Sequence, residues 1–142
     1  MAHIIVIGAG LGGMSAAYEL RTELGRDHRV TVVGNGDLFS FTPSNPWVAV
    51  GWRTRGDIEF PAGAPLAKRG IAFEPAGAKR VHPADNRVEL SDGRFLDYDY
   101  LVIATGPKLA FDEVPGLGPK GFTQSVCTHG HALQAWEQYQ QF

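Results

Sequence analysis

The segment HIIVIGAGLGGMSAAYEL, residues 3–20, determines the fold class of this chain. It begins with an apolar run, His3–Ile7, which is typical of a buried strand. Three glycines follow in the spacing GxGxxG: Gly8, Gly10 and Gly13. Apolar residues then recur with the period of a helix: Met14, Ala17, Leu20 and Leu24. The segment therefore predicts a strand, a glycine turn and a helix.

In that context the glycine turn predicts a dinucleotide-binding site. The first glycine permits the tight turn, the second lets a pyrophosphate lie against bare backbone, and the third lets the helix pack close to the strand. The start of the helix adds unpaired N–H groups and the positive end of its dipole. The residues expected to hold the pyrophosphate are Gly8, Gly10, Leu11, Gly12 and Gly13. The alternative is an ordinary glycine-rich turn in an unrelated α/β protein.

A second strand is predicted at Arg29–Val33, after Gly25 ends the helix, and this completes a right-handed βαβ unit. An acidic residue that binds the ribose is expected about 20 residues after the glycines. Gly34 and Asn35 stand there instead. Asn35 can hydrogen-bond ribose hydroxyls without a charge, whereas Asp37 is better explained as a solvated turn residue.

The remaining sequence predicts more strands and a final helix. Residues 34–51 are interpreted as a long ordered loop, Pro65–Arg69 as a helical turn and Tyr100–Ala104 as an apolar strand. A third parallel strand is expected at Ile71–Phe73, an antiparallel meander at 78–82, 87–90 and 94–98 with a two-residue Asp92-Gly93 hairpin, and a helix from His129 to Phe142. The predicted fold is α/β, one domain over 1–142: a parallel sheet with helices plus a three-stranded antiparallel β-meander.

Composition excludes several classes of protein. The chain has 142 residues, a net charge of -2 and basic residues scattered along the sequence, so no nucleic-acid partner is expected. No apolar run is long enough to span a membrane, and the N-terminus lacks the features of a signal peptide. A single cysteine, Cys127, cannot form an internal disulfide.

Cys127 lies just before the predicted helix, whose first turn contains His129 and His131. A helix N-terminus and a nearby imidazolium both raise the thiolate fraction of a cysteine, so this is the environment of a reactive thiol. The residues alone leave a small, buried, unreactive cysteine equally open. The pattern CxHxH lacks standard zinc spacing and a fourth ligand, so no metal site is expected.

The combination of the glycine turn, the meander and the strand ending in Ala104-Thr105-Gly106 resembles the FAD-binding half of two-dinucleotide-binding-domain flavoproteins. In those flavoproteins, the strand that ends in this Ala-Thr-Gly sequence passes beneath the cofactor. Dinucleotide-binding domains for NAD normally carry a crossover helix where this meander occurs. The resemblance therefore implies a Rossmann-like FAD-binding domain, and FAD as the cofactor.

Three further stretches make the chain resemble the sulfide:quinone oxidoreductases over its whole length. They are FTPxxPxxAxGW at 41–52, ATGPKL at 104–109 and SxCTxxHA at 125–132. The resemblance places Gly34 and Asn35 at the ribose, Ala78 at the adenine, Thr105 and Gly106 beneath the nucleotide, and Thr42, Pro43 and Pro46 at the flavin end. It also implies that Cys127 is the first of three redox cysteines and that His131 assists sulfur chemistry.

For the complete protein, the resemblance implies oxidation of sulfide, with electrons passing through FAD to a membrane quinone. Such a protein is a peripheral membrane enzyme about three times longer, and the chain resembles an incomplete domain of it. The 142 residues alone are then expected to be inactive as an enzyme, with no sulfide-dependent reduction of quinone, and to self-associate through the unpaired edge of Tyr100–Ala104. The alternatives are an NADH:quinone oxidoreductase, a flavocytochrome sulfide dehydrogenase, or a non-catalytic nucleotide-binding module.

Overall fold

The computed structural model describes residues 1–142, which divide into two compact units. Unit 1 comprises residues 1–39 and 61–106, and unit 2 comprises residues 40–60 and 107–142. The chain passes between them three times, at residues 39–40, 60–61 and 106–107. The first two crossings lie within two short paired strands, β3 (Leu38–Ser40) and β4 (Glu59–Pro61). Each unit is described by itself below.

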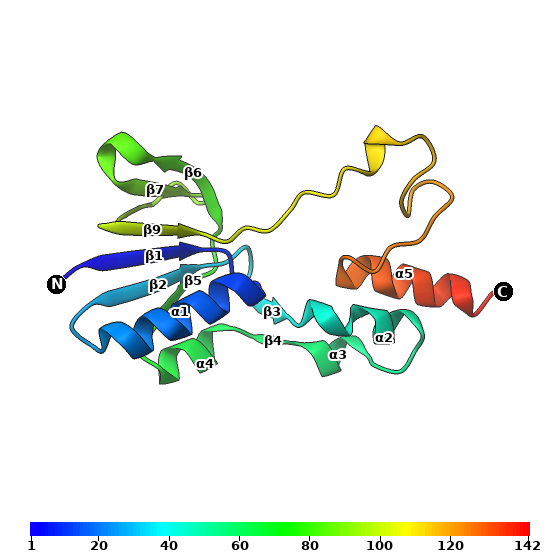
Figure 1. Ribbon diagram of the computed structural model, residues 1–142, viewed down its shortest axis with the longest axis horizontal. Helices are drawn as coiled ribbons and strands as arrows, with labels where there is room; N and C mark the ends of the chain where they lie inside the picture. The colour runs from blue at the N-terminus through cyan, green and yellow to red at the C-terminus, as the bar shows by residue number, and fades with distance from the viewer. The chain divides into compact units, whose positions relative to one another are not determined.

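Unit 1 is built on a four-stranded parallel sheet in the order β5-β2-β1-β9 (Figure 1). The strands are β1 (His3–Ile7), β2 (Arg29–Val33), β5 (Ala72–Glu74) and β9 (Tyr100–Ile103). Helix α1 (Leu11–Leu24) connects β1 to β2, and α4 (Gly63–Lys68) precedes β5. The predicted βαβ unit, the third parallel strand and the apolar strand before Thr105 are therefore confirmed.

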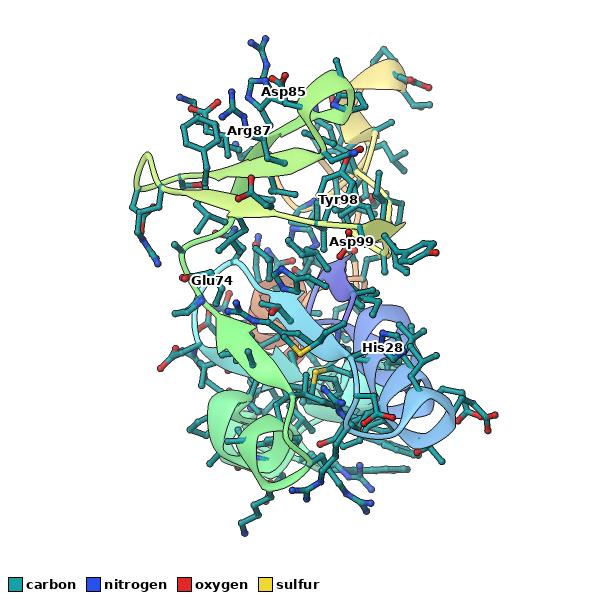
Figure 2. The ribbon with its side chains drawn as sticks, turned by 90° about the vertical axis from the view of Figure 1, so that its left-hand side faces the viewer. His28, Glu74, Asp85, Arg87, Tyr98 and Asp99 are labelled. Atoms are coloured by element: carbon teal, nitrogen blue, oxygen red, sulfur yellow. The ribbon has the colours of Figure 1, made fainter.

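Side chains on β1 alternate between two layers of core, one on each face of the sheet. Val6 packs with Met14 and Ala17 of α1, whereas Ile5 packs with Val88 and Leu90 of the meander. Burial on both faces explains why β1 and β2 are almost continuously apolar and do not alternate with polar residues. The start of β1 is held by two polar side chains, His28 and Asp99, which Figure 2 labels: the Ala2 N–H donates to His28 Nδ1 at 3.2 Å, and the His3 N–H donates to Asp99 Oδ2 at 2.6 Å.

The meander is confirmed as an antiparallel sheet of β6 (Ala78–His82), β7 (Arg87–Leu90) and β8 (Phe95–Asp97). The expected two-residue hairpin at Asp92-Gly93 is wrong. The Leu90 N–H donates to the Arg94 carbonyl at 2.8 Å, so three residues form the loop. A two-residue type I′ turn needs positive φ at both central residues, but only Gly93 has one, at +87°.

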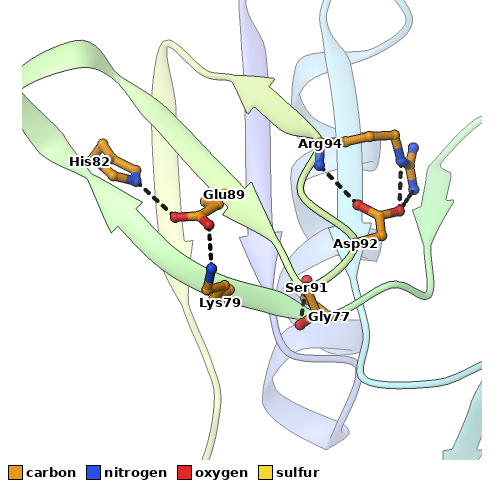
Figure 3. A network of polar contacts seen from close by, with 7 residues as sticks. All are labelled: Gly77, Lys79, His82, Glu89, Ser91, Asp92 and Arg94. Atoms are coloured by element: carbon orange, nitrogen blue, oxygen red, sulfur yellow. Dashed lines mark hydrogen bonds and ion pairs between the residues drawn. The ribbon is translucent and has the colours of Figure 1, made fainter.

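Ion pairs cross the meander on its polar side (Figure 3). Glu89 of β7 accepts from Lys79 Nζ at 2.7 Å and contacts His82 Nε2 at 3.3 Å, both on β6. Two hydrogen bonds lower the pKa of the Glu89 carboxyl: the one from Lys79 has the larger effect, and the one from His82 has the smaller. Arg94 contacts Asp92 at 2.7 Å in the hairpin and Glu74 of β5 at 2.8 Å, which ties the meander to the parallel sheet.

Unit 2 is mainly helical. It contains α2 (Asn45–Ala49), α3 (Arg55–Ile58) and α5 (His129–Tyr139), with short 3₁₀ turns at Thr42–Ser44 and Phe111–Glu113. Val48, Ile58 and Ala132 form its buried core. No helix in the structure combines the length and the apolar character needed to span a membrane.

The expected loop at residues 34–51 is wrong, because this stretch includes β3, a 3₁₀ turn and α2. Pro46 lies in the first turn of α2, where a proline is tolerated. The helix has only 5 residues and would not form alone. It is stabilised by burying Val48 against Ala132, a residue distant in sequence.

Candidate functional site

The glycine turn of unit 1 joins β1 to α1, and two of its glycines are required by the protein itself. Gly8 has a φ of +115°, and a Cβ there would overlap the carbonyl oxygen of Ala104 at the end of β9. A Cβ at Gly13 would overlap the Gly8 carbonyl oxygen. These two positions therefore admit only glycine if α1 is to pack this close to β1 and β9.

Gly10 differs, because nothing in the protein requires a glycine there. Its φ of -83° and ψ of -171° suit any residue, and a Cβ would meet no atom within 4 Å. Gly10 is the N-cap of α1, and the first turn carries no acidic residue. The bare backbone and the unpaired N–H groups of the helix start thus form a cradle that a side chain would fill. A pyrophosphate fits this cradle in shape and in charge.

Two other predicted cofactor residues, Asn35 and Ala78, are brought together in unit 1. Asn35 forms an isolated antiparallel bridge with Ala76, and a Cβ at Gly77 would lie 3.3 Å from Asn35 Oδ1. Asn35 is therefore adjacent to the segment that leads into Ala78. Gly34 is buried under the Phe73 ring, and its N–H donates to the Glu74 carbonyl at 2.8 Å.

Thr105 and Gly106 follow β9 and are both exposed. The Gly8 N–H donates to the Val33 carbonyl and the Ala104 N–H donates to the Ile7 carbonyl, each at 2.8 Å. These bonds align the ends of three parallel strands. The predicted pyrophosphate, ribose and ATG residues therefore all lie at the carboxyl edge of one parallel sheet, where ligands of open α/β sheets bind.

Cys127 belongs to unit 2, is exposed and forms no disulfide. It lines a cavity of about 430 Å³ together with Thr42 and Pro43, which the sequence assigned to the flavin end. The other lining residues are Pro107, Leu109, Val126 and Thr128. Residues that are 84 positions apart in the sequence, Pro43 and Cys127, thus share one cavity.

The thiol lies immediately before helix α5. Thr128 is the N-cap, and its side chain accepts a hydrogen bond from the His131 N–H at 3.2 Å. The Cys127 N–H donates to Ser125 Oγ at 3.2 Å. Because the Thr128 backbone is extended, Cys127 is outside the helix, and the rule that side chains four residues apart face each other does not apply to it and His131.

His131 accordingly lines a different cavity, of about 590 Å³, with Phe111 and Gln134. Its ring centroid is 5.6 Å from that of Phe111, and its Nδ1 atom is buried without a hydrogen-bond partner. Cys127 therefore shares a cavity with Thr42 and Pro43, whereas His131 lines the other one. No group of three His, Cys, Asp or Glu side chains is arranged to hold a metal ion.

Sequence reasoning missed two residues that hold the Cys127 segment. Asn45, which is fully buried, donates from Nδ2 to the Val126 carbonyl at 3.0 Å. Glu59 lies 3.5 Å from His129 Nδ1 through Oε1 and 2.6 Å from Arg55 Nε through Oε2. Both partners are distant from α5 in the sequence, so no local pattern indicated these contacts.

Replacing Glu59 by Gln should destabilise unit 2. The change removes the charge that faces His129 and Arg55, and buried polar groups that lose a partner cost about 1–3 kcal/mol. All three tryptophans are in unit 2, so urea unfolding followed by tryptophan fluorescence reports on this unit. Glu113→Gln, at an exposed carboxyl, is the matched control. Equal midpoints for the two variants would show that Glu59 does not anchor α5.

Comparison with known proteins identifies the family to which this chain belongs. The chain belongs to the pyridine nucleotide-disulphide oxidoreductase family, whose model matches residues 2–140. It is 40% identical to the sulfide-quinone reductase of Aquifex aeolicus over 98% of this chain and 31% of the relative.

A solved structure supports the same relationship. The sulfide:quinone oxidoreductase of Aquifex aeolicus superposes with a TM-score of 0.90 and 41% identity, covering 99% of this chain and 32% of that one. The external NADH-ubiquinone oxidoreductase 2 of Saccharomyces cerevisiae is 31% identical over 87% of this chain and 24% of the relative. The chain thus spans a third or less of the length of these relatives. The predicted resemblance to the N-terminal segment of the sulfide:quinone oxidoreductases, and its fold, are confirmed.

Proposed function

We propose that this chain is the FAD-binding part of a sulfide:quinone oxidoreductase. The observation that carries the proposal is the open backbone at Gly10, at the start of α1 and at the carboxyl edge of the parallel sheet. Gly8 and Gly13 are needed for packing, but the absence of a side chain at Gly10 is explained by a ligand that lies against it. The similarity to the Aquifex aeolicus protein supports FAD as that ligand and sulfide as the substrate.

In this proposal the N–H groups at the start of α1 bind the FAD pyrophosphate, and the positive end of the helix compensates its charge. Asn35 hydrogen-bonds the ribose hydroxyls, and the backbone at Ala78 contacts the adenine. Thr105 and Gly106 support the nucleotide, and Thr42 and Pro43 contact the flavin end. When bound, FAD supplies two-electron redox chemistry, which no side chain of this chain can supply.

Cys127 is proposed as the thiol that takes up sulfide sulfur as a persulfide. Forming the S–S bond between the thiolate and hydrosulfide releases two electrons and one proton, which bound FAD, as the oxidant of this step, would accept. A thiolate is the reactive form, and the exposed position before α5 gives a small anion direct access to it. Its cavity is wide enough for hydrosulfide. His131, which lines the other cavity of unit 2, is proposed to assist proton transfers in this chemistry. In the longer protein, the electrons would pass to a quinone at a membrane surface.

A second candidate function is NADH:quinone oxidation, which the similarity to the yeast NADH-ubiquinone oxidoreductase favours. That reaction has no use for a reactive cysteine, so the lone exposed thiol discriminates between the two candidates. A non-catalytic nucleotide-binding module is the third possibility.

Anaerobic reduction distinguishes these functions. The chain is loaded with FAD and treated in separate cuvettes with sulfide and with NADH, while the flavin absorbance is followed. We expect sulfide to bleach the flavin and NADH to leave it oxidised. Bleaching by NADH alone would establish the second candidate, and a bound flavin that neither reagent reduces would establish the module.

A further inference from the structure

A basic cavity of about 580 Å³ lies in unit 1, between the C-terminal ends of α1 and α4. Four cationic side chains and no acidic one line it: Arg21, Arg26, Lys68 and Arg69. The remaining lining residues are Tyr18, Thr22 and Gly25. This is a concentrated positive charge in a chain whose net charge is -2.

Arg21 forms the rigid wall of this basic cavity. Its guanidinium donates to the carbonyls of Gly25, His28 and Gly70 at 2.5, 2.9 and 3.0 Å. These bonds link the end of α1 to the turn that follows α4. The Arg21 Nε atom is buried and has no partner. The position of the cationic group is therefore set by the fold before any ligand binds.

The other three cationic side chains are exposed, and none forms an ion pair. Elsewhere in the chain, Arg55, Lys79, Arg87 and Arg94 each contact a carboxylate. The acidic residues nearest in sequence, Glu23 and Asp27, are also exposed, and neither lines the basic cavity. The positive charge in the basic cavity is therefore not compensated by carboxylates.

We propose that the basic cavity binds a phosphate group, carried by a soluble phosphate ester or by a lipid headgroup. Guanidinium groups match phosphate oxygens in geometry and donate charge-assisted hydrogen bonds to them. A concave site with converging cations suits a compact anion, whereas a nucleic acid requires a long basic stripe. The site is separate from the glycine turn, because the two lie at opposite ends of the 14-residue helix α1.

Cations near helix C-termini also stabilise helices, and the experiment has to separate that role from ligand binding. The substitutions are Arg26→Ala with Arg69→Ala, whose side chains are exposed and make no hydrogen bond in the structure, so their removal breaks no bond of the fold. The matched control is Arg29→Ala with Arg80→Ala, which removes the same charge at exposed positions outside the basic cavity. All proteins carry Gly10→Val, so that the glycine turn cannot bind the probe.

Inorganic pyrophosphate is the probe, titrated at low salt and followed by ³¹P NMR. We expect saturable binding with a Kd of about 1 mM or tighter in the parent chain, and similar binding in the control. The Arg26/Arg69 variant should bind at least about tenfold more weakly, and added salt should weaken binding in the parent. Equal affinity in the variant and the control would overturn the proposal, as would a change in thermal stability without any effect on pyrophosphate.

Vesicles identify the source of the phosphate group. The same proteins are sedimented with phosphatidylcholine vesicles that contain phosphatidic acid. Arg26- and Arg69-dependent sedimentation indicates a lipid headgroup, whereas dependence seen only with pyrophosphate indicates a soluble ester. If neither ligand distinguishes the variant from the control, the basic cavity is not a phosphate site.

Discussion

Replacing Gly10 by Asp should abolish FAD binding and leave the fold intact. Asp is a favourable N-cap residue, the Gly10 backbone suits it, and a Cβ there meets nothing in the protein. The carboxylate would occupy the cradle of the pyrophosphate and repel it, and such like-charge contacts cost several kcal/mol. We expect the FAD affinity to fall by about 100-fold or more, as measured by isothermal titration, with an unchanged or raised unfolding temperature.

Three further variants separate the causes. Gly10→Asn has the same shape without the charge and should weaken FAD binding less, whereas Gly10→Val should abolish it through bulk alone. Gly13→Ala should instead destabilise the fold itself, because its Cβ overlaps the Gly8 carbonyl and must displace α1. This loss of stability should appear as a lower unfolding temperature before any ligand is added. A folded Gly10→Asp protein with normal FAD affinity would contradict the assignment of this turn to the cofactor.

Replacing Cys127 by Ser should remove the response of the bound flavin to sulfide. A serine hydroxyl has nearly the shape of the thiol but is not ionised at neutral pH, so it cannot act as a thiolate nucleophile. We expect the rate of anaerobic bleaching by sulfide to fall by about 100-fold or more, since covalent capture by the nucleophile would be lost. FAD affinity should be nearly unchanged, because the pyrophosphate would be held at the glycine turn and serine keeps nearly the shape of the cysteine side chain.

Alkylation supplies a readout of Cys127 that does not need the flavin. Iodoacetamide should modify the folded chain at least as fast as the chain unfolded in urea, because the thiol is exposed and precedes the start of α5. Modification that requires unfolding would instead indicate a buried, structural cysteine. Unchanged bleaching in the Ser variant, together with fast alkylation of the parent, would mean that sulfide reduces the flavin without the thiol.

The short elements of this chain show where prediction from sequence ends. Strand β1 and helix α1 have strong local patterns, namely an apolar run, a glycine turn and a helical period. Helix α2 has no such pattern, and at 5 residues it is stable only because Val48 is buried against α5. Its contacts with Val126 and Ala132 join residues more than 80 positions apart, which no window of sequence can reveal.

The two histidines of the candidate site show the same limit of prediction from sequence. The sequence predicted that Cys127 precedes the helix and that His129 and His131 lie in its first turn, which agrees with an α5 that starts at His129 after the extended N-cap Thr128. Cys127 and His131 nevertheless line different cavities. His129, which the sequence suggested as an imidazolium near the thiol, lies 3.5 Å from Glu59 through its Nδ1 atom. Which neighbour a polar side chain finds depends on the cap and on packing, not on residue spacing.

By itself, the sequence determined the α/β class, the meander and the glycine turn, because each follows from short-range periodicity and from the backbone freedom of glycine. Only the tertiary structure showed that a side chain at Gly10 would meet no atom of the protein, whereas one at Gly8 or Gly13 would overlap the backbone of a neighbouring segment. Only the tertiary structure gathered basic residues that are scattered in sequence into one cavity. Both distinctions depend on atoms from distant segments, whose positions are set when the sheet and its helices pack together.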